Sequence, residues 1–170
     1  MPALPAPPPR EIPTVTAPTS AQAPASFATT PCPFCGQLNR TDLARLADGP
    51  RCGSCHRPLH FDRPIPVSDG EFDAVTGGTA VPILVDFYAD WCGPCRILAP
   101  VVDELARART GSLLVLKVDT DRSPAVAERF GIRGIPTLVV IRDGREVGRH
   151  VGLARRAELE AVVDAAGSPA

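Results

Sequence analysis

Apolar side chains in the second half of the chain follow two periods, which predict a strand followed by a helix. Residues 81–89, VPILVDFYA, form a nearly continuous apolar run, as is typical of a strand covered on both faces. The apolar positions that follow recur at helical spacing, at Ile97, Leu98, Val101, Leu105 and Ala108. The segment between them, residues 91–95, therefore lies where a buried strand ends and a helix begins.

Capping and turn residues outline the elements around this pair. A short helix is expected to begin at Ser68 or Asp69, because both residue types accept hydrogen bonds at helix N-termini. Residues 113–118 are apolar and predict a second buried strand. Ser123-Pro124 places a capping residue before proline, which favours the start of another helix.

The end of the chain predicts a hairpin and a last helix. Residues 137–142 and 146–151 alternate around Asp143-Gly144, a turn typical of antiparallel hairpins. Residues 154–166 have a helical pattern but no Ser, Thr or Asp at their start, so fraying is expected there. Parallel strands crossed by helices and followed by a hairpin predict an α/β domain, with a central mixed sheet flanked by helices on both faces.

The first thirty residues have a different composition from the rest. Of the 20 prolines in the 170 residues, many fall in 1–30, where Pro, Ala, Thr and Ser dominate. Such a segment buries too little apolar surface to offset the entropy of ordering its backbone, so we expect a disordered Pro/Ala-rich arm over 1–30. A polyproline II segment at Pro7-Pro8-Pro9 that docks on a partner is the alternative.

Charge and hydropathy exclude several classes of function. Eighteen basic and 19 acidic side chains give a formal net charge of −1, with no excess that would favour nucleic acid or a membrane surface. No apolar stretch approaches the length of a membrane span. The start of the chain lacks the basic residues and apolar core of a secretory signal, so a cytoplasmic protein is expected.

Four of the six cysteines form two Cys-x-x-Cys pairs ahead of the α/β domain. Cys32 and Cys35 are followed by Cys52 and Cys55, a spacing typical of a zinc ribbon over 31–63 with one structural Zn²⁺ held by four thiolates. Five basic side chains are available to offset the negative charge of such a centre, namely Arg40, Arg45, Arg51, Arg57 and His56. Cys52 to His56 also fits a c-type haem attachment motif, and two structural disulfides are a third possibility.

The remaining pair, in Trp91-Cys92-Gly93-Pro94-Cys95, has the spacing of a redox dithiol. Two cysteines separated by two residues can close a disulfide or remain open, and the Gly-Pro between them favours a turn into a helix. Backbone N–H groups at a helix N-terminus stabilise a thiolate at Cys92, which is expected to be the cysteine nearer the solvent. The arrangement predicts thiol-disulfide chemistry.

These residues resemble the thioredoxin family over about residues 66–167. The resemblance rests on Cys-Gly-Pro-Cys together with Asp86, Pro100 and Lys117, the loop Gly131-Ile132-Arg133-Gly134-Ile135-Pro136-Thr137, and Gly152, all at the family's spacing. With the cysteine pairs in front, the chain is similar to the zinc-containing bacterial thioredoxins of the thioredoxin 2 type. The resemblance implies a thioredoxin fold over 64–170.

The resemblance also implies roles for individual residues. Cys92 would be the nucleophile, Cys95 the resolving cysteine, Asp86 its base, and Lys117 the partner of that acid, while Pro136 would be cis. Trp91, Gly93, Pro94, Gly134, Ile135 and Gly152 would form the client-binding rim. Tyr88 departs from the family, in which many relatives carry Trp at this position.

The function that the resemblance implies is reduction of disulfides in client proteins. Electrons would come from NADPH through a thioredoxin reductase, with no bound organic cofactor, and the protein would act as a monomer. Two other readings remain: a zinc-binding redox-sensing or chaperone-like interaction module, and a thioredoxin-fold oxidase or isomerase. Pro94 argues against the latter, since isomerase relatives carry His there.

Overall fold

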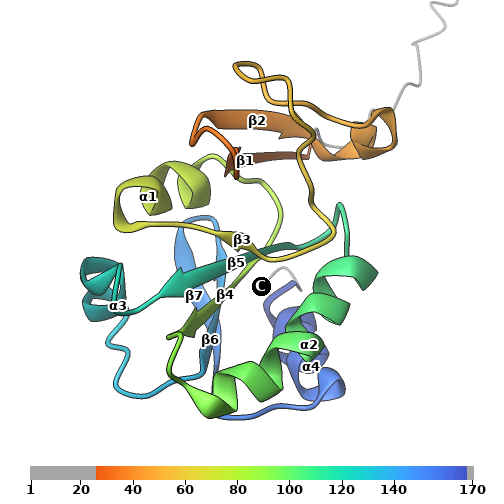
Figure 1. Cartoon of the computed structure of the whole chain (residues 1–170). Helices are drawn as coiled ribbons and strands as arrows, with labels where there is room; N and C mark the ends of the chain where they lie inside the picture. The colour runs from red at the N-terminus through yellow and green to blue at the C-terminus, as the bar shows by residue number, and fades with distance from the viewer. Residues whose placement is uncertain (1–25, 168–170) are drawn as a thin grey trace, which may run out of the picture.

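A five-stranded mixed sheet forms the centre of the computed structural model, which describes residues 26–167 (Figure 1). The strand order is β3-β5-β4-β6-β7, in which β3 and β4 run parallel to β5, while β6 is antiparallel to both β4 and β7. The strands are β3 (Ile65–Pro66), β4 (Ile83–Tyr88), β5 (Leu114–Asp119), β6 (Thr137–Arg142) and β7 (Arg145–Val151). The predicted mixed sheet is confirmed.

Helices cover both faces of this sheet. They are α1 (Asp69–Gly77), α2 (Gly93–Ala108), α3 (Pro124–Arg129) and α4 (Arg156–Gly167). Alternate side chains of β4 enter two separate apolar clusters, since Val85 packs with residues of α1 and α3, whereas Leu84 packs with residues of α2 and α4. The continuous apolar pattern of β4 follows from this burial on both sides.

Local hydrogen bonds and turn conformations determine where several helices and strands begin and end. The backbone N–H of Ser68 donates to the Glu71 side chain at 3.0 Å, so α1 begins with Ser68 as its N-cap. Asp143 and Gly144 have φ values of 51° and 73°, the left-handed conformation that a tight hairpin turn requires. At α4, where no capping residue was expected, Glu158 accepts a 2.7 Å hydrogen bond from the Arg155 N–H. An acid in the first turn therefore takes the place of the missing cap.

The buried face of α2 differs in part from the sequence pattern. Leu98, Val102 and Leu105 are buried, but Ile97 is 66% exposed. Ile97 lies two residues after Cys95, so its exposed side chain adds to the surface near the cysteine pair instead of the core. Ala108, also expected on the buried face, is exposed at the other end of α2.

The first cysteine-rich segment forms a small two-stranded sheet that packs on α1. Strands β1 (Phe27–Pro31) and β2 (Leu38–Asp42) are antiparallel, and a 3-10 turn, η1 (Leu43–Asp48), follows. Residues 1–25 of the predicted arm lie outside the described residues, but its last residues belong to β1. Ala28 and Thr30 alternate inward in this strand, a burial pattern that favours the extended form over disorder.

The ribbon shares a core with the α/β domain. Its buried residues Ala28, Leu43 and Leu59 belong to the same apolar cluster as Phe72 and Val85. Thr29 Oγ1 donates to the Gly78 carbonyl at 3.0 Å, in a contact so close that a Cβ on Gly78 would lie 2.3 Å from that oxygen. The ribbon is thus fixed to the C-terminus of α1. None of the helices within residues 26–167 has the length and apolar content that crossing a bilayer requires.

Candidate redox site and metal centre

The Cys92–Cys95 pair lies where β4 passes into α2, at the opposite end of the molecule from β1 and β2 (Figure 1). Cys92 is the N-cap residue of α2, and a disulfide with an S–S distance of 2.07 Å joins it to Cys95. The structure thus holds the oxidised form. The expected position of the motif at a helix N-terminus is confirmed.

One backbone N–H group of α2 points at the sulfur of Cys92. The Cys95 N–H donates to Cys92 Sγ at 3.1 Å, and this contact would favour a thiolate once the bridge is opened. Cys92 is 3% exposed and Cys95 is 6% exposed, so in the oxidised form Cys92 is not nearer the solvent as expected. Tyr88 and Ile135 pack against the buried cluster that the two cysteines form with Ala89.

The loop before β6 lies beside this pair. The Ile135–Pro136 peptide bond is cis. Thr137 Oγ1 donates to the Gly134 carbonyl at 2.7 Å, and the Gly152 N–H donates to the Pro136 carbonyl at 2.9 Å. These bonds bring the start of β6 and the end of β7 together next to Cys92, where the sequence placed the client-binding rim.

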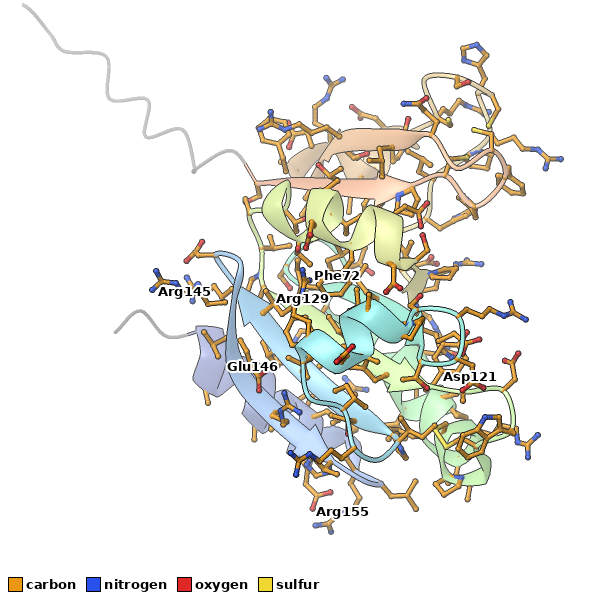
Figure 2. The ribbon with its side chains drawn as sticks, turned by 90° about the vertical axis from the view of Figure 1, so that its left-hand side faces the viewer. Phe72, Asp121, Arg129, Arg145, Glu146 and Arg155 are labelled. Carbon is orange, nitrogen blue, oxygen red and sulfur yellow. A yellow bond between two sulfur atoms is a disulfide. The ribbon has the colours of Figure 1, made fainter. Side chains whose placement is uncertain are left out.

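Exposed apolar side chains surround the redox pair. Trp91, Ile97, Val151 and Leu153 are exposed by 68%, 66%, 63% and 52% respectively. Pro94 and Gly134 are also exposed, whereas Gly93 and Gly152 are half-buried. The Trp91 indole N–H donates to the Asp121 carboxylate at 2.8 Å, and Figure 2 shows the labelled Asp121 on the loop after β5. Because no pattern connects positions 91 and 121, the sequence could not have indicated Asp121.

Asp86 is a buried carboxyl group on β4. It is 3% exposed, which excludes a strand-end acid facing water, and its neighbours Val85 and Phe87 are fully buried on the opposite face. Asp86 Oδ1 has no hydrogen-bond partner among the described residues. Burial raises the pKa of Asp86 to about 6, the charge of Lys117 opposes this rise, and that of Asp103 adds to it. A carboxyl group with this pKa can take up a proton near neutral pH.

Lys117 lies on β5 directly beside Asp86 in the sheet register. Within residues 26–167 no ion pair joins the two side chains; instead, Lys117 Nζ lies 4.2 Å from the centroid of the Tyr88 ring. The expected pairing with the acid is therefore a longer-range electrostatic effect. Tyr88, which departs from the family pattern, holds the ammonium group, and burial raises the pKa of Tyr88 itself.

The four ribbon cysteines converge on one point. Their sulfurs all lie within 4.8 Å of one another, with 3.5 Å between Cys32 and Cys55 and 3.6 Å between Cys35 and Cys52. A tetrahedral zinc with Zn–S bonds of about 2.3 Å requires sulfurs about 3.8 Å apart, so the four residues fit this ion. The separations are too long for disulfide bonds, and haem attachment would use only Cys52 and Cys55.

Two similar turns bring the sulfurs together. The Gly36 N–H donates to the Cys32 carbonyl at 2.9 Å, and the His56 N–H donates to the Cys52 carbonyl at 3.0 Å. Gly36 and His56 have φ values of 74° and 60°, so each turn closes on a left-handed residue directly after its second cysteine. His56 therefore has a backbone role in the turn, although its sequence context also fits a haem motif.

Neutral donors, and not the arginines, contact the sulfurs. Cys52 Sγ accepts from the Ser54 N–H at 3.4 Å and from the Asn39 amide at 3.6 Å. Backbone donation, from Cys55 first, lowers the pKa of Cys52 to about 6. The arginines proposed to offset the charge make other contacts: Arg57 stacks on Phe34, Arg40 stacks on Phe27, Arg45 pairs with Asp48, and Arg51 donates to the His56 carbonyl.

Comparisons with known proteins match both parts of the chain. The thioredoxin family model matches residues 63–165, and a model described as the N-terminal part of thioredoxin 2, a zinc ribbon, matches residues 31–57. Thioredoxin C-3 of Corynebacterium nephridii is 35% identical over 133 residues, which cover 78% of this chain and 91% of that protein. Thioredoxin 1 of Synechococcus elongatus is 45% identical over 98 residues, which cover 58% of this chain and 92% of that protein. Among solved structures, a mutant thioredoxin from Halobacterium salinarum is 40% identical with a TM-score of 0.59, covering 66% of this chain and 97% of that one.

Proposed function

The chain belongs to the thioredoxin family, and from this membership we propose that it is a protein-disulfide reductase that uses Cys92 and Cys95. Thiol-disulfide oxidoreductase chemistry follows from the family itself. The observation that carries the finer proposal is the position of the pair: both cysteines are bridged at the N-terminus of α2, with a backbone N–H directed at Cys92 Sγ.

The reaction transfers two electrons from the dithiol to the client. The Cys92 thiolate attacks one sulfur of the client disulfide, which forms a mixed disulfide and releases the first client thiolate. Cys95 then loses its proton and attacks Cys92 Sγ. The mixed disulfide breaks, the second client sulfur leaves as a thiolate that takes up a proton, and the chain is left with the Cys92–Cys95 bridge.

Asp86 is the base proposed for Cys95. It is buried on the face of β4 that packs against α2, the helix that carries Cys95. Its raised pKa, about 6, suits proton uptake near neutral pH, and Oδ1 has no other hydrogen-bond partner among the described residues to compete for the proton. Lys117 lies beside it on β5 and limits this rise through its positive charge.

The client would bind in extended form along the loop that ends at Pro136. Ile135 packs against the cysteine pair, and its backbone groups precede the cis bond. An extended segment of the client can pair with such backbone groups, while Trp91, Gly93, Pro94, Gly134 and Gly152 contribute the surrounding surface. The exposed apolar side chains at this edge support a protein client more than a small molecule.

Zinc bound by Cys32, Cys35, Cys52 and Cys55 would be structural. When bound, the ion links the two turns and supplies folding free energy to a segment that has few apolar residues of its own. All four protein ligands are sulfurs, which leaves no open position of the kind that catalytic zinc sites keep.

We further propose that a thioredoxin reductase with NADPH recharges the oxidised pair, and that the protein works as a cytoplasmic monomer. The proposal is tested by insulin reduction with NADPH and a thioredoxin reductase. The wild-type chain is expected to turn over, Cys92→Ser to be inactive, and Cys95→Ser to accumulate mixed disulfide. A wild-type chain that binds clients without reducing them would instead indicate an interaction module. A chain that oxidises dithiols faster than it reduces disulfides would indicate an oxidase.

A further inference from the structure

The only tyrosine and the only lysine of the chain, Tyr88 and Lys117, are in contact beside the buried acid. Lys117 Nζ lies over the Tyr88 ring, 4.2 Å from its centroid, within the range of cation–π attraction. Tyr88 follows Asp86 by two positions on β4, and side chains alternate along a strand. Asp86 and Tyr88 therefore share one face of the sheet, the face on which Leu84 packs against α2.

The ammonium group of Lys117 is turned away from the partner that the sheet register offers it. Lys117 is paired directly with Asp86 across β5 and β4, and its flexible stem could bring the ammonium group to the carboxyl group. Asp86 Oδ1 nevertheless has no hydrogen-bond partner among residues 26–167, although the side chain is only 3% exposed. A buried carboxylate attracts a neighbouring cation strongly, because the interior screens charge weakly. The Tyr88 ring is the contact that holds the ammonium group instead.

The charged groups on the solvent side of Lys117 do not account for this position. Lys117 lines a cavity of about 420 Å³ with two acids and two arginines, namely Asp62, Asp103, Arg63 and Arg107. Within residues 26–167 neither acid forms an ion pair with Lys117, and Asp62 instead pairs with Arg63 at 2.9 Å. The two guanidinium groups repel an ammonium group, so they cannot hold it in place.

The remaining groups around Asp86 and Tyr88 leave Lys117 as the one cation within reach of the acid in the described part of the chain. Asp103 of α2 is half-buried, and its charge favours the protonated form of Asp86. Arg122 acts on Tyr88, but it pairs with Asp119 at 3.4 Å and with Asp90 at 3.6 Å. The apolar cluster on this face contributes Leu138 of β6, which lies beside Asp86, and Leu159 and Val163 of α4.

We propose that Tyr88 is a positioning residue for the redox step: its ring holds the Lys117 ammonium group away from Asp86 and leaves Asp86 Oδ1 free to take the proton of the Cys95 thiol. That proton is held on Asp86 while the Cys95 thiolate attacks Cys92 Sγ, and it then returns to the solvent. Tyr88 and Lys117 exchange no proton with the reacting atoms. A direct ion pair with Lys117 would stabilise the ionised carboxylate and make it a weaker base. The inference rests on the proposed function, because that function assigns Asp86 its role.

Three substitutions in the full chain test this inference. Tyr88→Leu removes the ring and keeps an apolar side chain, whereas Tyr88→Phe keeps the ring and loses only the hydroxyl group, so it is the matched control. Lys117→Met removes the ammonium group, alone and combined with Tyr88→Leu. The main measurement is the pH titration of the Asp86 carboxyl group by carbon NMR in the oxidised protein, and the second is the pH profile of mixed-disulfide release.

Tyr88→Leu is expected to lower the titration midpoint of Asp86 by on the order of one pH unit, because the released ammonium group moves to the carboxylate. Tyr88→Phe should keep the wild-type midpoint. In the Lys117→Met background the same Tyr88→Leu change should leave the midpoint where it is. An unchanged midpoint in a folded Tyr88→Leu chain overturns the proposal. A shift that persists without the ammonium group also overturns it, because the cause would then be water entering beside Asp86.

A measurement on the wild-type chain does not depend on how well the variants fold. Isotope-labelled lysine gives a single set of signals, and the ε-methylene protons of Lys117 should be shifted upfield by the ring current of Tyr88. Signals at the positions of a free lysine would overturn the proposal. None of the NMR measurements needs turnover. If the midpoint moves as expected while the release profile stays in place, the role of Asp86 as base is refuted and the placement of Lys117 by Tyr88 is supported.

Discussion

The indole N–H of Trp91 donates a 2.8 Å hydrogen bond to the carboxylate of Asp121, thirty residues further along the chain. Trp91 directly precedes Cys92 and is 68% exposed, so this bond fixes the orientation of a side chain that packing alone leaves free. Trp91, the largest exposed apolar side chain near the redox pair, is thereby held in one position beside the disulfide.

The fluorescence of Trp91, the only tryptophan, should report the redox state. Closing the Cys92–Cys95 bridge places a disulfide quencher beside the indole, so emission is expected to be lower in the oxidised form than in the reduced form. Asp121→Ala should reduce this difference, since the ring is no longer held. Identical wild-type spectra in both redox states would contradict the proposed contact.

Asp86→Asn should slow release of the mixed disulfide more than its formation. The amide cannot accept the Cys95 proton, whereas the attack of Cys92 on the client does not need that base. Rapid-quench kinetics with a labelled disulfide client would measure both steps, with Cys95→Ser as the reference in which release is abolished. An equal slowing of both steps would remove Asp86 from this role.

Asp86→Asn should also stabilise the folded chain against unfolding above pH 6. The pKa of Asp86 rises from 3.8 to about 6 in the folded chain, so the folded state binds more protons and stability falls as the pH rises between these values. At pH 7.5 the ionised acid costs about 3 kcal/mol, which Asp86→Asn removes. Urea unfolding should show this gain at pH 7.5 and none below pH 4. A gain of the same size at both pH values would point to packing instead of ionisation.

Periodicity and motif spacing predicted most of the α/β domain, because its strands and helices bury regular apolar patterns. The position of the redox motif and the mixed character of the sheet also followed from the sequence, whereas the strand order did not. Contacts between residues far apart in the sequence could not be predicted in this way. Thr29 meets Gly78 across 49 positions, and Lys117 stacks on Tyr88 in place of an ion pair with Asp86, and neither contact leaves a local pattern.

The two cysteine turns of the ribbon were predictable, since Cys-x-x-Cys pairs have a characteristic spacing. The core that the ribbon shares with α1 was not predictable. Ala28 and Leu59 are unremarkable in sequence, and only the docked arrangement buries them. The strand Phe27–Pro31 extends into the segment expected to be disordered for the same reason. Burial against a neighbouring element gave this short polar stretch its structure.

Metal analysis should find one zinc per chain, and this zinc should remain bound while mild oxidant cycles Cys92 and Cys95. Removal of zinc by a chelator is expected to lower the thermal midpoint of the whole chain by on the order of 10 °C, because Cys32 and Cys52 belong to the core shared with the α/β domain. Calorimetry with and without chelator would measure the effect. A chain without zinc, or two separate transitions of which the larger is unaffected, would contradict this expectation.

Gly78→Ala should destabilise the chain by about 1 to 3 kcal/mol. The new methyl group would lie 2.3 Å from Thr29 Oγ1 and 2.8 Å from the Ala74 carbonyl, so β1 must move away from α1. Gly77→Ala is the matched control, because a Cβ at this neighbouring position meets nothing within 4 Å. Chemical unfolding of both variants checks the prediction, and equal stabilities would show that the join between ribbon and domain tolerates displacement.

The ribbon and the redox pair lie at opposite ends of the molecule (Figure 1). A surface or a fusion partner attached through the ribbon would leave Trp91 and the loop around Pro136 uncovered. The ribbon could thus serve as an attachment site that leaves the Cys92–Cys95 pair accessible. Immobilised by the ribbon on an electrode or a resin, it would present every copy of its disulfide in the same outward orientation.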